Sequence, residues 1–195
     1  MMPVMDDDHG VTIGADGLAR CRWVGSDPLY VRYHDEEWGR ELRGEDALFE
    51  RICLEAFQSG LAWITILRKR EGFRTAFAGF EIAKVAKFGE KDVARLLADE
   101  SIVRNRAKIN AAITNAKAAQ ALDGALTDLI WSHAPTNRSR PQSTAEIPAT
   151  TPESIALAKS LKKVGFAFVG PTTAYALMQA CGLVNDHVVS CHTKK

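Results

Sequence analysis

The chain has 195 residues, of which 46% are hydrophobic and 25% are charged. This length suits one domain with a single sizeable core, and the composition is typical of soluble globular proteins, which excludes disordered, collagen-like and membrane-spanning chains as global descriptions. The formal net charge of +1 averages unlike parts, because residues 1–20 hold four acids against Arg20 alone, and residues 21–195 carry a net charge of +4. Such a mild excess permits an anionic partner without requiring one.

Two segments of the sequence indicate where in the cell the protein is located. Residues 1–10 are acidic and lack the apolar core of a secretory signal. Val164–Asn185 contains no Asp, Glu, Lys or Arg, but its glycines, proline and polar residues would break or polarise a spanning helix. We therefore expect a cytoplasmic protein without a membrane segment.

Residues 1–20 show no apolar period and predict a flexible N-terminal extension, with structure beginning near Cys21. Apolar spacing predicts helices over 45–59, 61–77 with an interruption near Gly72, 81–87, 90–98, 101–121 and 125–133. Residues 135–152 are rich in Pro, Ser and Thr and predict a surface loop, after which Thr151 and Pro152 begin a helix that ends near Lys163. No stretch shows sustained two-residue alternation, so the fold class is all-α, with residues 21–195 as a single helical domain.

The segment from Leu161 to Gly182 predicts a helix, a glycine-bounded turn and a second helix. Gly165 can end the first helix, and Gly170 and Pro171 stand where an N-cap and a first-turn proline belong. The free N–H groups at such a helix start bind anions, so a DNA phosphate suits this turn. From these residues alone, a plain helical hairpin of the core is an equally valid interpretation.

Four cysteines without a signal peptide point to free thiols or a metal site rather than to disulfides. Cys53 and Cys181 lie in apolar helical patterns and are expected to be buried. Cys191 follows His187 by four residues, a spacing that places both side chains on one face of a helix, as a pair of metal ligands requires.

A structural zinc site needs two further ligands, since it is almost always four-coordinate. Cys21 and His34 are the candidates. His9 lies in the extension, His133 stands at a helix edge, and His192 is on the wrong face beside Cys191. Spacing alone leaves this long-range pairing as one possibility among several.

Three long motifs of the chain resemble the DNA-3-methyladenine glycosylase I family. They are C-x-W-V-x-x-D-P-L-Y-x-x-Y-H-D-x-E-W-G from Cys21, ICLEAFQSGLAWITILRKRE from Ile52 and GFAFVGPTTAYALMQACGLVNDHVVSC from Gly165. The resemblance implies a helix-hairpin-helix DNA glycosylase fold with a zinc site that ties the N- and C-terminal segments together. It also implies a monomer that hydrolyses the N-glycosidic bond of 3-methyladenine, and of 3-methylguanine, in alkylated double-stranded DNA. The product is an abasic site, without lyase activity, because no lysine matches a Schiff-base nucleophile.

The resemblance also assigns roles to individual residues. It implies one structural Zn²⁺ per chain, held by Cys21, His34, His187 and Cys191. It implies Glu55 as the catalytic residue in contact with the base. The remaining implied contacts are Tyr33, Trp63, Trp23 and Trp38 to the base, and Gly60, Leu61, Gly165, Gly170, Thr172 and Thr173 to DNA.

One position departs from the wider superfamily. Many of its members carry a catalytic Asp two residues before the histidine of a V-D-x-H segment, where this chain has Asn185. An amide cannot act as a carboxylate base, but the family that the chain resembles shares this Asn. Methylation at N3 leaves the base positively charged and its bond to deoxyribose weakened, so little acid catalysis is needed. Glu55 then accepts hydrogen bonds from the flipped base; direct activation of water is its alternative role.

Two other functions compete with this interpretation. The first is a DNA-binding module that keeps the hairpin and the zinc without catalysis, which leaves Glu55 beside Tyr33 and Trp63 unexplained. The second is a zinc hydrolase of small molecules, which four protein ligands disfavour because no open position is left for water. Trp131 is expected to belong to the core.

Overall fold

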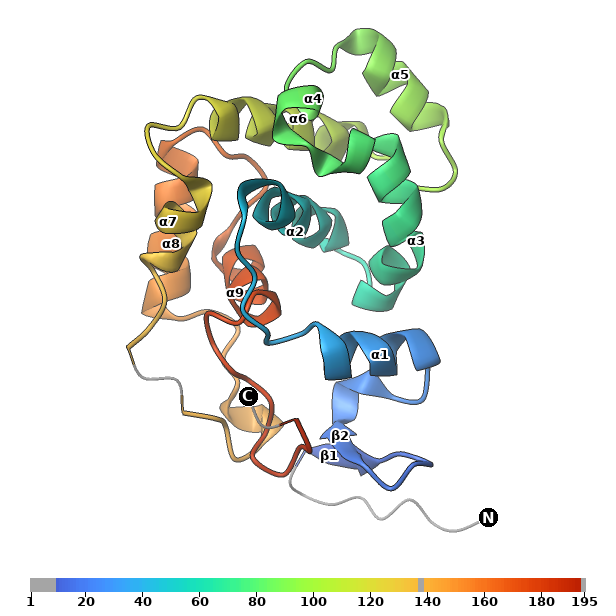
Figure 1. Ribbon diagram of the computed structural model, residues 1–195, viewed down its shortest axis with the longest axis vertical. Coiled ribbons are helices and arrows are strands. Elements are labelled where there is room, and N and C mark those ends of the chain that lie inside the picture. Colours follow the sequence, from blue (N-terminus) through green and yellow to red (C-terminus); the bar gives the residue numbers. More distant parts are fainter. Residues whose placement is uncertain (1–9, 137–138, 194–195) are drawn as a thin grey trace.

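The structure is a computed structural model in which residues 10–136 and 139–193 are described. A short antiparallel hairpin of β1 (Val11–Ile13) and β2 (Ala19–Cys21) precedes a helical body (Figure 1). The helices are α1 (Pro28–Glu36), α2 (Glu45–Gln58), α3 (Trp63–Ala76), α4 (Ile82–Val85), α5 (Glu90–Ala98), α6 (Arg106–Gln120), α7 (Leu126–Trp131), α8 (Pro152–Lys163) and α9 (Pro171–Ala180), with 3-10 turns η1 (Arg22–Val24), η2 (Ala78–Phe80) and η3 (Thr144–Glu146). The predicted all-α class is confirmed for the body of the chain.

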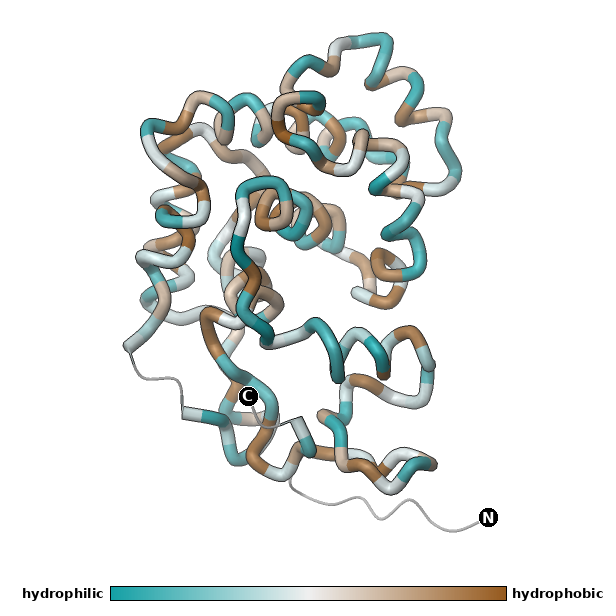
Figure 2. Tube along the Cα trace, in the orientation of Figure 1, coloured by the Kyte–Doolittle hydropathy of each residue, from teal (hydrophilic) through white to brown (hydrophobic). Residues whose placement is uncertain are grey.

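Helix α2 is the centre of this body, and α3, α6, α7 and α9 pack around it (Figure 1). All its residues from Leu48 to Phe57 are buried apart from the half-buried Glu50. A helix that is hydrophobic on nearly every side requires partners on every side. Figure 2 shows the same pattern in colour, with hydrophobic positions recurring along the helices between hydrophilic ones.

Several predicted helices agree with the structure. The ranges 45–59, 90–98 and 152–163 correspond to α2, α5 and α8. The Thr151 side chain caps α8 by accepting a hydrogen bond from Ser154 N–H at 3.2 Å.

The interruption expected near Gly72 is wrong, because α3 continues through this residue. A Cβ at Gly72 would lie 2.7 Å from Ser101, so the glycine permits a close approach of two segments. Close packing, rather than a helix break, explains this glycine.

The structure begins earlier than the expected start near Cys21. Strands β1 and β2 pair Val11 with Cys21, and His192 N–H donates to the Ala19 carbonyl at 2.8 Å. Strands of three residues are too short to show an alternating pattern, which is why the sequence does not predict them. Residues 1–9 of the expected extension lie outside the described residues.

Helix α1 is also absent from the predicted elements, although the sequence contains its signal. Asp27 caps this helix by accepting from Leu29 N–H at 2.9 Å, and Pro28 is its first residue. This is the same N-cap and proline signature that predicts α8.

Helices α8 and α9 pack against each other as the expected helix-hairpin-helix. Gly170 is the N-cap of α9, and Pro171 is its first residue. Asn115 of α6 is fully buried and pins the turn, since its side chain accepts from Ala167 N–H at 2.7 Å and donates to the Ala167 carbonyl at 3.1 Å. In the described part of the chain, no helix has the length and hydropathy to cross a bilayer.

We expect Asn115→Ala to lower the free energy of unfolding by about 2 kcal/mol, because it removes both bonds and leaves the Ala167 backbone groups without a partner. Asn110→Ala, on the exposed side of the same helix, is the matched control and should leave stability unchanged or slightly higher. Urea unfolding measures both values, and equal effects of the two substitutions would contradict the role of the buried amide.

Candidate functional site

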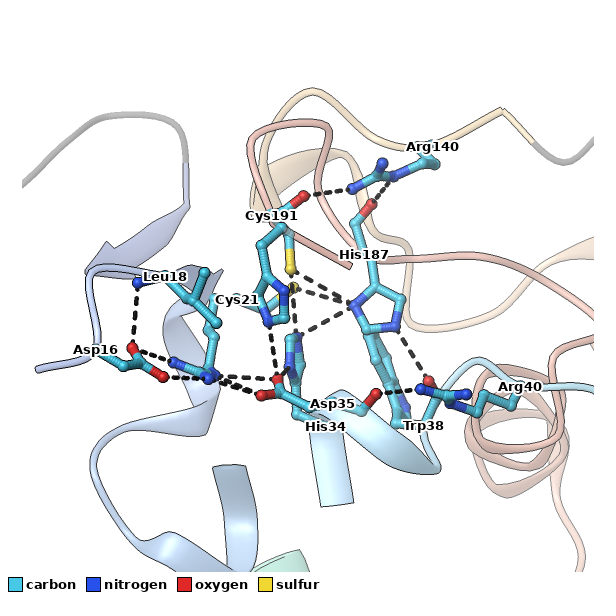
Figure 3. Close-up of polar contacts among 12 residues, drawn as sticks. Asp16, Leu18, Cys21, His34, Asp35, Trp38, Arg40, Arg140, His187 and Cys191 are labelled. Atoms are coloured by element: carbon cyan, nitrogen blue, oxygen red, sulfur yellow. Dashed lines mark hydrogen bonds and ion pairs between the residues drawn. The ribbon is translucent and has the colours of Figure 1, made fainter. Parts of the chain in front are cut away.

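Four side chains from opposite ends of the chain meet at the base of the body. Cys21 ends β2, His34 lies in α1, and His187 and Cys191 lie in the loop after α9 (Figure 3). All four are buried, and their ligand atoms lie within 4.8 Å of one another. The distance from His187 Nδ1 is 3.2 Å to His34 Nε2, 3.8 Å to Cys191 Sγ and 3.9 Å to Cys21 Sγ.

This arrangement fits a tetrahedral metal ion. Metal–nitrogen bonds of about 2.0 Å and metal–sulfur bonds of about 2.3 Å separate the ligand atoms of such an ion by about 3.3 to 3.8 Å. The observed separations, including 3.5 Å between Cys191 Sγ and His34 Nε2, match this spacing. The cluster can therefore hold a metal with four protein ligands.

The outward-facing nitrogens of the two histidines support the same interpretation. His34 Nδ1 lies 2.7 Å from Asp35 Oδ1, and His187 Nε2 lies 3.1 Å from the Trp38 carbonyl oxygen. Each ring can thus donate its N–H to an oxygen and turn its lone pair toward the cluster, as metal-binding histidines do. Gly39 makes room for this contact, because a Cβ there would lie 3.0 Å from His187 Nε2.

His187 and Cys191 are not on a helix, which corrects the argument from helical spacing. The loop turns back on itself through a bond from Cys191 N–H to the Val188 carbonyl at 2.9 Å. Arg140 holds this turn, with hydrogen bonds of 2.9 Å to the His187 carbonyl and 3.2 Å to the Cys191 carbonyl (Figure 3). It also donates to the Val188 carbonyl at 2.5 Å. The sequence offers no signal for Arg140, because its contacts are to backbone atoms remote along the chain.

His192 is also better placed than the sequence suggests. Its Nε2 lies 3.0 Å from Asp35 Oδ1, the same oxygen that faces His34. Arg20 binds both oxygens of Asp35 at 2.7 to 3.0 Å. Asp35 thus joins β2, α1 and the C-terminal loop beside the cluster.

A cavity of about 400 Å³ lies next to the cluster. The five residues that the resemblance assigns to base contact all line it: Trp23, Tyr33, Trp38, Glu55 and Trp63. The lining is completed by Tyr30, Gln58, Thr144, Ile147, Ala176 and Gln179, none of which the sequence singles out. Five aromatic side chains and one carboxylate line this space, which is large enough for a purine.

The cluster and the cavity share walls. Tyr33 precedes His34 on α1, and its ring centre lies 5.4 Å from that of Trp63. The Trp38 ring is 4.6 Å from the His187 ring and 5.0 Å from the Trp23 ring. A metal at the cluster would therefore fix the aromatic wall of the cavity.

Glu55 is the acid of the cavity and is only 5% exposed. Burial raises the pKa of Glu55 to about 7, and the positive charge of Arg51 acts in the opposite direction. Trp63 contributes an indole N–H that is buried and has no hydrogen-bond partner among the described residues. Buried polar groups of this kind are usually satisfied, so this N–H is an exception, and Glu55 is the group that offers the cavity a hydrogen-bond acceptor.

Four of the six residues assigned to DNA contact line a second hollow. Gly60 and Leu61, after α2, line it together with Thr172 and Thr173 of α9, and it shares Glu55 with the aromatic cavity. Leu61 is 40% exposed. Gly165 and Gly170 bound the turn between α8 and α9 and are not part of this lining.

Lys108 of α6 supports the turn that carries Gly60 and Leu61. Its Nζ donates to the Phe57 carbonyl at 2.9 Å and to the Ser59 carbonyl at 2.6 Å. These bonds satisfy carbonyl groups at the C-terminal end of α2. They therefore fix the position of the turn at Gly60 and Leu61 relative to the cavity.

The other expectations concern residues outside the cavity. Cys53 and Cys181 are buried as predicted, and Trp131 packs half-buried against the core. His133 is not near the cluster, since it faces Ser160 at 3.0 Å. Asn185 accepts a bond from His187 N–H at 3.3 Å and lines a different hollow from Glu55. The position of the superfamily's catalytic Asp therefore lies outside the aromatic cavity.

A helical body with a helix-hairpin-helix beside an aromatic cavity that contains a buried carboxylate is the arrangement expected of a DNA glycosylase. The methyladenine glycosylase family model matches residues 23–194. The chain belongs to this family.

Individual relatives agree with this membership. DNA-3-methyladenine glycosylase 1 of Escherichia coli K12 is 50% identical over 179 residues, which cover 89% of this chain and 96% of that protein. A crystal structure of a 3-methyladenine DNA glycosylase I has a TM-score of 0.87 and 48% identity, covering 90% of this chain and 100% of that one. A variant of such an enzyme in complex with 3-methyladenine has a TM-score of 0.84 and 32% identity, covering 90% of this chain and 97% of that one.

The buried carboxylate predicts a dependence of stability on pH. The folded-state pKa of Glu55, about 7, lies above its ordinary value of 4.5, so the folded state binds this proton more tightly and stability is lost as the pH rises from about 4.5 to about 7. We expect Glu55→Gln to be more stable than the unaltered chain by on the order of 2 to 3 kcal/mol at pH about 8, and nearly equal to it at pH about 5.

Unfolding free energies at the two pH values test this expectation. Glu36→Gln, an exposed acid of α1, is the control. A stability difference for Glu55→Gln that does not grow between the two pH values would show that the carboxylate is not protonated preferentially in the folded state.

Proposed function

We propose that this chain hydrolyses the N-glycosidic bond of 3-methyladenine, and of 3-methylguanine, in double-stranded DNA, as a monomer and without cutting the strand. Its family membership already makes it a glycosylase that removes alkylated bases in DNA repair. The observation that carries the finer proposal is the position of Glu55, buried in an aromatic cavity beside the hairpin. In the described chain, no lysine lines this cavity, which supports hydrolysis without lyase chemistry.

The chemistry needs little from the protein. The base is cationic after methylation at N3, so the C1′–N9 bond breaks with its electron pair passing to the base, which leaves neutral. Water adds to C1′ and releases a proton, and the products are the free base and an abasic site. The cavity must therefore hold the flipped base and favour its methylated form, rather than protonate a leaving group.

We assign these tasks to the residues that line the cavity. The Glu55 carboxylate accepts hydrogen bonds from the base edge, and its negative charge stabilises the cationic form. Trp63 stacks on the base, Tyr33 holds its edge, and Trp23 and Trp38 close the wall. An aromatic face against a cation contributes about 0.5 to 2 kcal/mol.

DNA contact is assigned to the residues around the second hollow. Leu61, with Gly60 beside it, fills the gap that the flipped base leaves in the duplex, as small apolar wedges do. The start of α9 offers N–H groups near Thr172 and Thr173 to a phosphate, in a turn bounded by Gly165 and Gly170. Contacts of this kind grip the backbone and are independent of sequence.

We assign the ion of the Cys/His cluster as one structural Zn²⁺ per chain. Two thiolates and two imidazoles are a typical zinc donor set, and four protein ligands leave no open position for an activated water. The group would therefore stabilise the fold, while Cys21, His34, His187 and Cys191 hold it. This argues against a metal-dependent hydrolase, and the carboxylate in the cavity argues against a DNA-binding module without catalysis.

We expect protein purified without chelators to contain one zinc per chain by elemental analysis. Cys191→Ala should lose this zinc and lower the Tm by on the order of 10 °C, because the cluster joins distant parts of the chain. Cys53→Ala, at a buried cysteine remote from the cluster, should keep its zinc. A metal-free native protein, or zinc retained by Cys191→Ala, would overturn the assignment.

Incubation with DNA treated with a methylating agent tests the reaction itself. We expect release of 3-methyladenine and 3-methylguanine, identified by chromatography, with strands that break only after later alkaline treatment of the abasic sites. Strand cleavage without alkali would contradict the proposed hydrolysis, and release of neither base would overturn the proposed substrates.

Glu55→Gln isolates the charge of the carboxylate, since Gln is nearly isosteric. We expect excision to fall by on the order of 10 to 1000-fold, or about 1.4 to 4 kcal/mol at the transition state, with duplex binding and zinc content unchanged. For the unaltered chain, kcat/KM should rise as the pH passes about 7 and Glu55 loses its proton, a limb that Glu55→Gln should lack. Unchanged excision by folded Glu55→Gln would remove Glu55 from the mechanism.

A further inference from the structure

Arg51 is a buried cation whose charge acts on the pKa of Glu55, but to which the proposed function assigns no contact. It lies on α2 one turn before Glu55 and is only 9% exposed. Arginine is rarely buried without a specific partner, because removing a guanidinium from water is costly. The contacts of Arg51 therefore indicate what it does.

Those contacts point to the wall of the base cavity. Arg51 NH1 donates a hydrogen bond of 3.1 Å to the Tyr33 hydroxyl oxygen. The guanidinium carbon lies 5.6 Å from the centre of the Tyr33 ring and 5.9 Å from that of Trp63. Arg51 thus lies beside two of the rings that line the cavity without itself lining it.

Glu37, the residue directly after α1, is the acid that forms an ion pair nearest to Arg51, but its hydrogen bonds go to another arginine. Glu37 receives two hydrogen bonds from Arg70, of 2.5 and 2.9 Å, whereas Arg51 NH2 is 3.7 Å from it, beyond hydrogen-bond distance. A simple ion pair with Glu37 therefore does not account for the position of Arg51. Its hydrogen bond to Tyr33 is the specific contact.

This bond has only one possible direction. A guanidinium donates and never accepts, so the Tyr33 oxygen is the acceptor, and the phenol keeps its own hydrogen for another partner. Among the described residues, no group accepts that hydrogen, and Tyr33 lines the cavity. The open direction for donation is the cavity itself.

We propose that Arg51 is a positioning residue of the base pocket, which fixes the Tyr33 hydroxyl as a hydrogen-bond donor to a ring nitrogen of the flipped purine. The inference rests on the proposed function, since it takes the aromatic cavity as the base site. Together, Tyr33 supplies a donor and Glu55 an acceptor to the base edge. Such a pair distinguishes a purine that offers a ring nitrogen beside an amino group from one that does not.

Binding of free 3-methyladenine, measured by quenching of tryptophan fluorescence, provides the test. Four proteins form a cycle: the unaltered chain, Tyr33→Phe, Arg51→Met and the double variant. Met preserves much of the apolar stem of Arg51 and leaves Glu37 paired with Arg70. Arg51→Lys is the rescue variant, because Lys also donates without accepting.

We expect Tyr33→Phe to weaken binding by about 10-fold, the effect of one hydrogen bond, and Arg51→Met by about 3 to 10-fold. At a pH well above 7, where Glu55 is ionised and the effect of the Arg51 charge on its protonation is removed, the double variant should bind no more weakly than Tyr33→Phe, because Arg51 acts through the hydroxyl. Arg51→Lys should recover at least part of the loss. Thermal unfolding and zinc content verify that each variant keeps its fold.

The outcomes separate this inference from the proposed function. If the unaltered chain does not bind 3-methyladenine, the pocket assignment fails and the role of Arg51 fails with it. If binding is intact but Arg51→Met leaves it unchanged, or if the losses of the two single variants add up in the double variant, the role of Arg51 alone is overturned.

A comparison without any change at Arg51 covers the case in which Arg51→Met does not fold. The unaltered chain and Tyr33→Phe are titrated with 3-methyladenine and with its 1-deaza and 7-deaza analogues, in which a ring nitrogen becomes C–H. The unaltered chain should lose about 10-fold in affinity for one analogue, and Tyr33→Phe should not distinguish that analogue from 3-methyladenine. Equal affinities of the unaltered chain for all three ligands would overturn the inference.

Discussion

The meeting of Cys21, His34, His187 and Cys191 is the constraint on which the rest of the site depends. Ligand atoms separated by up to 170 positions in the sequence, from Cys21 to Cys191, lie within 4.8 Å of one another. A contact between such distant segments restricts the unfolded chain strongly, although the restriction grows only slowly with loop length. Because Tyr33 adjoins His34 and the Trp38 carbonyl faces His187, the same contact fixes two walls of the base cavity.

Electrostatics in the cavity follow from its burial. Glu55 receives no hydrogen bond from the described residues, so burial and the charge of Arg51 set its pKa. In this low-dielectric setting an ionised carboxylate is costly in the free protein, and the cationic base of the proposed function would stabilise it. The free-energy cost of ionising Glu55 in the free protein would therefore be recovered when a cation binds. A carboxylate that favours binding of a cation thus lowers the stability of the free protein.

The sequence predicts some parts of the molecule better than others, for physical reasons. Apolar spacing and capping residues are local, so α2, α5 and α8 follow from them. The resemblance names the five residues that the structure brings to one cavity, but periodicity alone would leave Glu55 as an exposed helix acid. Arg140 could not be predicted, since it binds backbone carbonyls 47 to 51 positions away.

The loop between α7 and α8 shows most clearly why such contacts escape prediction. Its composition is that of a surface connection, yet Thr144 and Ile147 line the base cavity and Arg140 holds the turn of the metal-binding loop. Gly10, at the start of the N-terminal hairpin, packs against Thr144 so closely that a Cβ would lie 3.0 Å from its methyl group. The β1–β2 hairpin, the α7–α8 loop and the turn that carries His187 and Cys191 therefore contact one another around the cluster. Their conformations depend on these contacts more than on local sequence signals. Because the loop contacts the hairpin and the C-terminal turn and also lines the cavity, we expect a change in any of these segments to alter the wall of the cavity.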